Sequence, residues 1–323
     1  MTERDSHSAG PHRPLPHNVG ATGLSGNVQG ALWMLASGAA FTVFAVLVKL
    51  MSADYSPAFL AFWRAFIALV LSVPFIMIGG WSVVRVTRPG LVFVRSIFGT
   101  FGFLLSIYAI SDAYGLPLSQ FNAISFSRSL FVTVLAALIL RESVGKQRWG
   151  AVIVGFGGVI VMVLGDALMS GEGLSGGSMI GTLLALGSSV SLAGAIIMVK
   201  SLAATHKPIT LLIWANILST VFLAPFAVLH WSAPSLQDWG VITALSACAF
   251  GGQFCYIKAM SVGDASFLSP MDYLRLPMAA GADWLLFRIL PGLYVWIGAA
   301  LIVGSTLFIA VREARKRGVP ASR

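Results

Sequence analysis

Two segments of the chain, GALWMLASGAAFTVFAVLVK (Gly30–Lys49) and GTLLALGSSVSLAGAIIMVK (Gly181–Lys200), are similar along their whole length at an offset of 151 residues. Later positions keep nearly the same spacing, because Pro57, Trp63, Pro74, Tyr108 and Gly150 align with Pro208, Trp214, Pro225, Tyr256 and Gly298. Ordered matches over this length indicate an internal duplication. The chain is therefore expected to hold two copies of one structural unit.

The composition of the chain is that of a membrane protein. Hydrophobic residues make up 57% of its 323 residues and charged residues 10%, whereas about a quarter of a soluble globular protein is charged. A helix needs about 20 mostly apolar residues to cross a bilayer. We predict an all-α integral membrane protein with ten transmembrane helices, at about 31–51, 57–78, 91–110, 117–140, 148–166, 178–199, 208–230, 239–260, 266–287 and 292–311.

The number of spans in each repeated unit predicts how the two units are oriented. Each unit holds five spans, and an odd number reverses the direction in which the second unit enters the membrane. Two inverted five-helix repeats are typical of secondary transporters, whose substrate site lies near the midplane between the repeats. The expected divisions are a polar tail at 1–28, a first repeat at 29–168, a second repeat at 178–311 and a basic tail at 312–323.

The Lys and Arg residues outside the spans lie almost entirely on one side. Fourteen of them are on the side of the N-terminal tail, and Arg288 alone is on the other side. By the positive-inside rule both termini are expected in the cytoplasm, in a multi-pass protein of the bacterial inner membrane. The formal net charge of +9 then reflects membrane orientation, so no nucleic-acid partner is expected.

The segment SPMDYLRLPM, residues 269–278, places an Asp and an Arg between two prolines in the ninth span. Pro270 and Pro277 are each expected to remove a helical hydrogen bond and bend the helix. Freed carbonyls inside a membrane are tolerated only where protein or cavity water satisfies them. The pattern therefore predicts an interrupted helix that lines a solute site, with Asp272 and Arg275 among the substrate-binding residues.

Arg128 is a further candidate for substrate binding. Arg128 and Arg275 both lie about ten residues into their spans, near the midplane of the fourth and ninth helices. An Arg at that depth costs at least about 2.5–3.5 kcal/mol, so each is expected to face a polar cavity and a partner. Asp272 shares a helix face with Arg275, three residues away. It either takes part in binding or forms an ion pair that only neutralises Arg275.

The remaining ionisable groups differ in depth. Arg64 lies seven residues into the second span, about 10 Å deep, and is a candidate for facing the cavity. Asp283 is a candidate for proton coupling, because a buried carboxyl group can carry a proton. Lys49, Lys258 and Arg95 lie near span ends, where long side chains are expected to snorkel to the interface.

Aromatic residues and the balance of deep charges bear on the substrate. The deep Arg residues outnumber the deep Asp residues, which favours a solute with a carboxylate or phosphate over a cationic drug. Aromatic side chains could stack on a flat substrate, or serve only as packing and interface residues. The candidates are Trp63, Tyr108, Trp214, Tyr256 and Tyr273.

Several stretches resemble a known family. They are FWRAFIAL in the second span, FVRSIFGTFGFLLSIYAI in the third, LSQFNAISFSRSLFVTVLAALILRESVGKQRWGAVIVGFGGVIVM across the fourth and fifth, and ASFLSPMDYLRLPMAAGADWLLF in the ninth. They resemble the drug/metabolite transporter superfamily, specifically its ten-span bacterial branch with paired EamA-type repeats. The last stretch is most similar to the subgroup that includes S-adenosylmethionine and riboflavin uptake transporters. The resemblance covers roughly residues 29–311 and implies a transport function.

The expected function is a secondary transporter that moves a small zwitterionic or ring-bearing metabolite by alternating access. Riboflavin, S-adenosylmethionine and amino acid-like compounds are the leading examples. One alternative is a proton-coupled exporter of drugs or metabolites. A membrane-embedded enzyme is a distant alternative, because the chain has no HExxH motif. No cofactor or metal is expected. The expected partners are the substrate and the lipid bilayer, and the chain is expected to be either a monomer or a homodimer.

Overall fold

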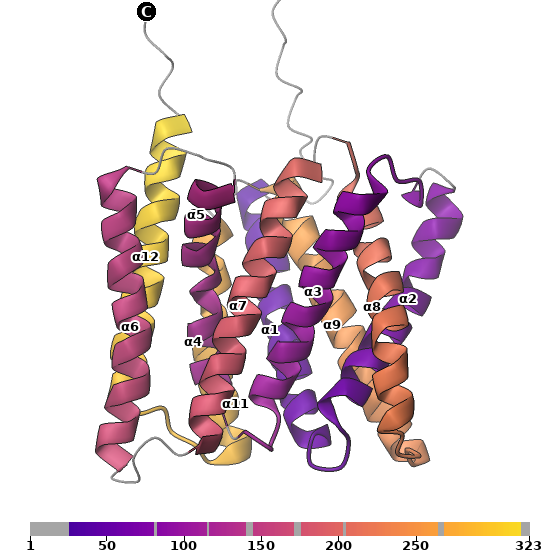
Figure 1. Ribbon diagram of the computed structural model, residues 1–323, viewed down its shortest axis with the longest axis horizontal. Coiled ribbons are helices and arrows are strands. Elements are labelled where there is room, and N and C mark those ends of the chain that lie inside the picture. The colour runs from indigo at the N-terminus through magenta and orange to yellow at the C-terminus, as the bar shows by residue number, and fades with distance from the viewer. Residues whose placement is uncertain are drawn as a thin grey trace, which may run out of the picture.

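The computed structural model describes residues 26–80, 83–114, 116–139, 145–170, 176–202, 205–263 and 268–317. These residues form helices and no strands, and the helices stand side by side as an upright bundle (Figure 1). The all-α prediction is thus confirmed. The tails expected at 1–28 and 312–323 lie largely outside the described residues.

The helices follow the predicted spans closely. The first half contains α1 (Gly26–Met51), α2 (Pro57–Gly79), α3 (Pro89–Ile110), α4 (Leu118–Phe126), α5 (Arg128–Ile139) and α6 (Lys146–Ser170). The second half contains α7 (Gly176–Leu202), α8 (Pro208–Leu229), α9 (Leu236–Val262), the 3₁₀-helix η2 (Ser269–Leu274), α11 (Arg275–Phe287) and α12 (Leu293–Arg317). With α4 and α5 counted as one, nine spans in the described residues are long and apolar enough to cross a membrane. The tenth is divided between η2 and α11.

Turn and capping residues explain where several helices begin. Pro57 starts α2, where its missing N–H costs no helical hydrogen bond. The Ser56 hydroxyl just before it accepts a hydrogen bond from the Phe59 N–H, at 3.2 Å. At the start of α9, Ser235 and Asp238 form a capping box, each side chain accepting a hydrogen bond from the backbone of the other.

The fourth and ninth spans are both interrupted near their centres. The fourth changes from α4 to α5 between Phe126 and Arg128, although no proline lies there. The ninth begins as η2, with Pro270 in its first turn, and becomes α-helical at Arg275. The expected loss of a helical hydrogen bond at Pro277 does not occur, and a bend there stays a prediction. Pro277 is the third residue of α11, where a backbone N–H has no intrahelical partner in any case.

Helices from the two halves pair with one another in a regular pattern. α1 packs on α9 and α3 packs on α7, while α2 packs on α8, α4 on α11 and α6 on α12. In the alignment of the two halves, α1 corresponds to α7 and α3 to α9, so the α1–α9 and α3–α7 pairs correspond to each other. In each of the other three pairs, a helix packs on its own counterpart from the other half. This pattern agrees with a two-fold relation between the halves, and the inverted repeat stays a prediction.

Two glycines allow α6 and α12 to approach closely at one edge of the bundle (Figure 1). A Cβ atom on Gly158 would lie 2.7 Å from the carbonyl oxygen of Gly298, and a Cβ on Gly298 would lie 2.5 Å from that of Gly158. Small residues at such a crossing let two backbones pack directly, as in many membrane bundles. Gly158 and Gly298 therefore have a packing role.

Candidate functional site

An ion pair between Arg275 and Asp272 forms the centre of the candidate site. Arg275 is the first residue of α11, and its Nε lies 2.9 Å from Oδ1 of Asp272 in η2. Their side chains are 15% and 17% exposed. The spacing of three residues places both on one face, as predicted. The break between η2 and α11 therefore lies directly beside a charged pair within the bundle.

α1 and α9 hold the Arg275 guanidinium from the other side. Its Nη2 donates a hydrogen bond to Ser37 Oγ at 3.2 Å, and that hydroxyl donates to the Gly252 carbonyl at 2.8 Å. The guanidinium also stacks over the Phe41 ring, 4.4 Å from its centroid. Phe41 in turn needs Gly252, because a Cβ there would lie 2.9 Å from the ring. The direction of Arg275 thus depends on three neighbours from two other helices.

Arg128, at the first position of α5, is brought into the same region from the first half of the chain. It lies within electrostatic range of Arg275, Tyr256 and Tyr273. None of the described residues forms an ion pair or hydrogen bond with its half-buried guanidinium. Asp272 balances one of two Arg charges, so the centre carries one surplus positive charge. Such a site suits a solute with an anionic group or strong acceptors.

Tyr273 ties the site to α12 and α4. Its hydroxyl donates a hydrogen bond to Thr306 Oγ1 at 2.5 Å. Its ring meets that of Phe126 edge to face, with centroids 4.8 Å apart. Because Phe126 ends α4, the two interrupted spans touch at the level of their breaks.

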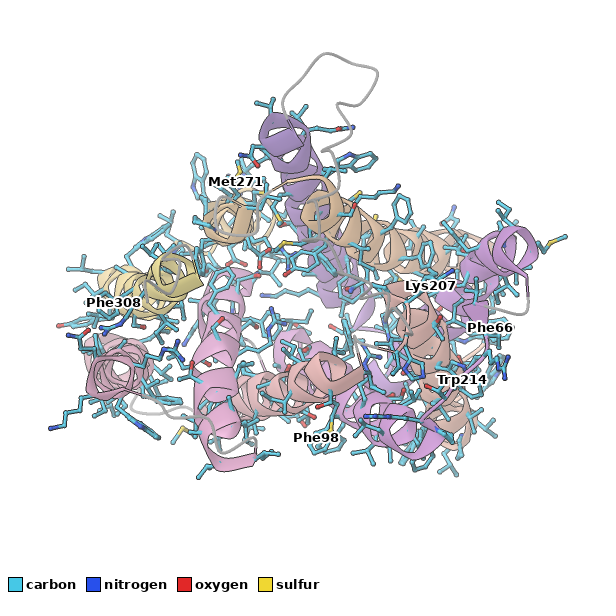
Figure 2. The ribbon with its side chains drawn as sticks, turned by 90° about the horizontal axis from the view of Figure 1, so that it is seen from above. Phe66, Phe98, Lys207, Trp214, Met271 and Phe308 are labelled. Carbon is cyan, nitrogen blue, oxygen red and sulfur yellow. The ribbon has the colours of Figure 1, made fainter. Side chains whose placement is uncertain are left out.

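Four predicted binding residues lie elsewhere. The Arg64 guanidinium lies over the Phe103 ring of α3, 4.4 Å from its centroid, and Tyr108 pairs with Tyr114 at 6.3 Å. Trp63 packs edge to face on Trp239 at 4.6 Å. Trp214 donates its indole N–H to the Val84 carbonyl at 2.9 Å, near the edge of the bundle (Figure 2). Each of the four thus has a packing contact, although Trp63 Nε1 and Arg64 Nε have no hydrogen-bond partner among the described residues. Their part in binding stays a prediction.

Asp283 is fully buried and accepts three hydrogen bonds. They come from the backbone N–H of Leu118 at 3.0 Å and from the N–H and hydroxyl of Ser119 at 2.7 and 2.6 Å. The carboxylate therefore caps the N-terminus of α4, which gives it a structural role. Its role in proton coupling stays a prediction.

Two of the three side chains expected to snorkel make contacts inside the bundle. Lys49 is only 7% exposed, and its Nζ has no hydrogen-bond partner among the described residues and lies 4.6 Å from the Phe287 ring centroid. Arg95 is half-buried, and its Nη1 donates to the Leu211 carbonyl at 3.1 Å. Lys49 and Arg95 thus each contact a neighbouring helix within the bundle. Lys258 is exposed, as expected.

Ser37, Phe41 and Thr306 contact the central charges or Tyr273, but sequence reasoning did not single them out. One signal was available for Ser37, because it aligns with Ser188 at the same offset of 151 residues. The two serines play matching roles, since Ser37 joins α1 to α9 and Ser188 joins α7 to α3 through a 2.6 Å hydrogen bond with Ser106. Phe41 and Thr306 carry no comparable signal.

Interrupted apolar helices that meet around paired charges define a polytopic membrane protein of the transporter class. The model of the EamA-like transporter family matches residues 28–164 and again residues 179–311. The chain therefore belongs to the EamA-like transporter family and is a membrane transporter. The resemblance inferred from the sequence is confirmed.

Relatives with named functions align over most of the chain. A riboflavin transporter of Vibrio cholerae serotype O1 is 32% identical over 299 residues, 90% of this chain and 95% of its own. An S-adenosylmethionine uptake transporter of Rickettsia prowazekii is 26% identical, with 89% and 94% covered. The pseudopaline exporter CntI of Pseudomonas aeruginosa is 26% identical, with 85% and 93% covered. A solved crystal structure, 18% identical with a TM-score of 0.58, covers 88% of this chain and 99% of its own and shares the fold.

Proposed function

We propose that this chain is a secondary transporter that moves a small zwitterionic or ring-bearing metabolite across the bacterial inner membrane by alternating access. The observation that carries the proposal is the charge balance at the centre. Asp272 neutralises Arg275, while Arg128 lies in electrostatic range of both Arg275 and two Tyr rings without an ion-pair partner among the described residues. A half-buried guanidinium within an apolar bundle favours an acceptor, and a solute carboxylate or carbonyl would supply it.

The relatives narrow the candidate solutes. S-adenosylmethionine has a carboxylate that a planar guanidinium such as that of Arg128 would bind through two parallel hydrogen bonds. Riboflavin is uncharged at neutral pH, so its ring carbonyls would accept hydrogen bonds from the same guanidinium, and its flat ring would stack on Tyr256 or Tyr273. Riboflavin is the first candidate, because its named carrier has the higher identity to this chain. Amino acids come next.

The two interrupted spans would act as hinges in this mechanism. The changes from α4 to α5 and from η2 to α11 adjoin Arg128 and Arg275. Rotation about these breaks would open the site to one side while the outer parts of the helices stay packed. Rocking of one repeat against the other is the usual form of alternating access in transporters built from inverted repeats.

The test is uptake by purified protein in liposomes. We expect saturable uptake of labelled riboflavin or S-adenosylmethionine, with labelled leucine as the amino acid probe. Arg128→Ala should abolish uptake, and Arg128→Lys should retain only part of it, because an ammonium lacks the planar fork of a guanidinium. Lys146→Ala, at the exposed start of α6, is the matched control and should transport normally. Normal transport by Arg128→Ala would contradict the proposed site.

A proton-coupled exporter is the second candidate, and its support is the similarity to a named exporter. Inverted membrane vesicles that acidify their interior distinguish the two directions. An exporter loads such vesicles with solute when the proton gradient forms. Expulsion of a lipophilic cation, with no movement of the three metabolites, would favour the exporter and contradict the argument from surplus Arg charge.

A further inference from the structure

A groove of about 330 Å³ opens on the side of the bundle between α2, α8 and α9. None of the residues of the central site lines it. Its walls are apolar except at one end, where two polar residues stand. Its lining residues include Phe75, Ile78, Val83, Leu212, Phe254 and Lys258.

The chain builds one end of this groove with a specific turn after α2. Gly80 has φ of +62°, a conformation that glycine adopts without strain. A Cβ atom on Gly79 would overlap the side chain of Val83, so the turn depends on both glycines. Val83 is thereby folded back against the end of α2. The rings of Phe75 and Phe254, with centroids 5.7 Å apart, join α2 to α9 beside it.

At the other end of the α2–α9 interface, side chains fill the space between the two helices. There Trp63 of α2 contacts Trp239 of α9 at a centroid distance of 4.6 Å, and Trp231 contacts both Trp63 and Phe59, at 6.4 and 5.6 Å. Large aromatic side chains thus fill the α2–α9 interface at one end of the bundle, while the groove remains open at the other end. The open end lies on the face where α1 begins and α12 ends.

Positive side chains surround the open end. Lys258 is exposed, and its Nζ lies 5.9 Å from the centroid of the Phe254 ring that lines the groove. Lys207 precedes the first turn of α8, next to the lining residue Ile209, on the same side of the bundle as Trp214 (Figure 2). Arg85 and Arg88 are exposed just after Val83. A groove with apolar walls and a cationic mouth at the membrane surface matches the two halves of an amphiphile.

We propose that this groove binds an anionic phospholipid. One acyl chain lies against Phe75, Ile78 and Leu212, and the phosphate of the headgroup meets Lys258 and Lys207. A phospholipid fits better than a free phosphate, because most of the binding surface is apolar and faces the hydrocarbon region. An anionic headgroup fits better than a zwitterionic one, because the cations at the mouth attract net negative charge. The proposal is independent of which solute the central site carries.

The test uses the full chain in phosphatidylcholine nanodiscs doped with phosphatidylglycerol that carries a photoactivatable group on its acyl chain. We expect labelled peptides from the groove walls of α2, α8 and α9. Lys258→Gln should lower labelling about fivefold, the factor that corresponds to about 1 kcal/mol for one Lys charge near the surface. Lys146→Gln, on the same face at the start of α6, is the control and should label like the parent chain.

A second pair of variants tests whether the apolar walls of the groove bind the acyl chain. Leu212→Trp should fill the groove and remove the labelling while Lys258 keeps its charge, and Val221→Trp, on the exposed face of the same helix, should not. Equal labelling by a phosphatidylcholine probe, or an equal loss in Lys146→Gln, would overturn the proposal. Labels outside the groove would also overturn it. Lys258→Gln must retain solute uptake, which separates this proposal from the central site.

Discussion

The carboxylate of Asp283 in α11 accepts hydrogen bonds from both the N–H and the hydroxyl of Ser119, the second residue of α4, at 2.7 and 2.6 Å. Negative charge at a helix N-terminus is favoured by the helix dipole. α4 belongs to the first half of the chain and α11 to the second. One buried carboxylate therefore fastens the two interrupted spans to each other, close to the face opposite the start of α1 and the end of α12.

Replacement of Asp283 by Asn should destabilise the protein. An amide has one acceptor oxygen, and its NH₂ group would face a backbone N–H, so we expect the free energy of unfolding to fall by about 3 kcal/mol. Asp54→Asn, in the exposed loop after α1, is the control and should change it by about 0.5 kcal/mol or less. Thermal unfolding in detergent measures both. Unchanged stability with loss of proton-driven uptake would instead support the coupling role.

Variants of Asp272 and Arg275 test whether this ion pair takes part in solute binding or only neutralises its own charges. Arg275→Ala should abolish uptake while the protein still inserts, and Asp272→Ala should impair it, because Arg275 loses the partner at 2.9 Å that fixes its direction. The double variant Asp272→Asn with Arg275→Gln keeps the net charge of this pair at zero and leaves the charge of Arg128 in place. We expect it to be inactive in the liposome assay. Normal uptake by the double variant would show that the pair only neutralises itself.

Two adjacent glycines in α9 provide a matched test of how Arg275 is positioned. A Cβ at Gly252 would press on the Phe41 ring at 2.9 Å, whereas a Cβ at Gly251 meets no atom within 4 Å. Gly252→Ala should therefore displace Phe41 and Arg275 and raise the KM for the solute by about tenfold, as expected for a loss of about 1.4 kcal/mol. Gly251→Ala should leave KM unchanged. Equal effects of the two substitutions would mean that Phe41 does not position Arg275.

Membrane orientation can be tested with single cysteines after Cys248 and Cys255 are replaced by Ser. Ala53 in the loop after α1 and Gln147 at the start of α6 are both exposed and lie on opposite faces. With both termini in the cytoplasm, Ala53→Cys should react with an impermeant thiol reagent in intact cells, and Gln147→Cys should react only after the cells are opened. The reverse pattern would contradict the positive-inside prediction.

The central site was predictable only in part from the sequence. The depth of Arg128 and Arg275 and the spacing of Asp272 and Arg275 are properties of the chain itself. In the structure Asp272 and Arg275 form an ion pair, and Arg128 lies within electrostatic range of it. Depth does not specify the rotation of a helix about its axis. Trp214 and Arg64 therefore lie at plausible depths, yet contact Val84 and Phe103 rather than the centre.

The sequence by itself determined that this protein is a bundle of ten apolar spans in two similar halves, and placed a carboxylate and two guanidinium groups deep within it. Apolar length and charge position suffice for this, because the bilayer acts on each span separately. Only the tertiary structure decided that Asp283 caps α4, that Phe41 and Ser37 hold Arg275, and that Lys49 turns inward over Phe287. Each of these contacts joins residues more than 150 positions apart, or depends on which neighbouring helix offers a partner, and no local pattern encodes that choice.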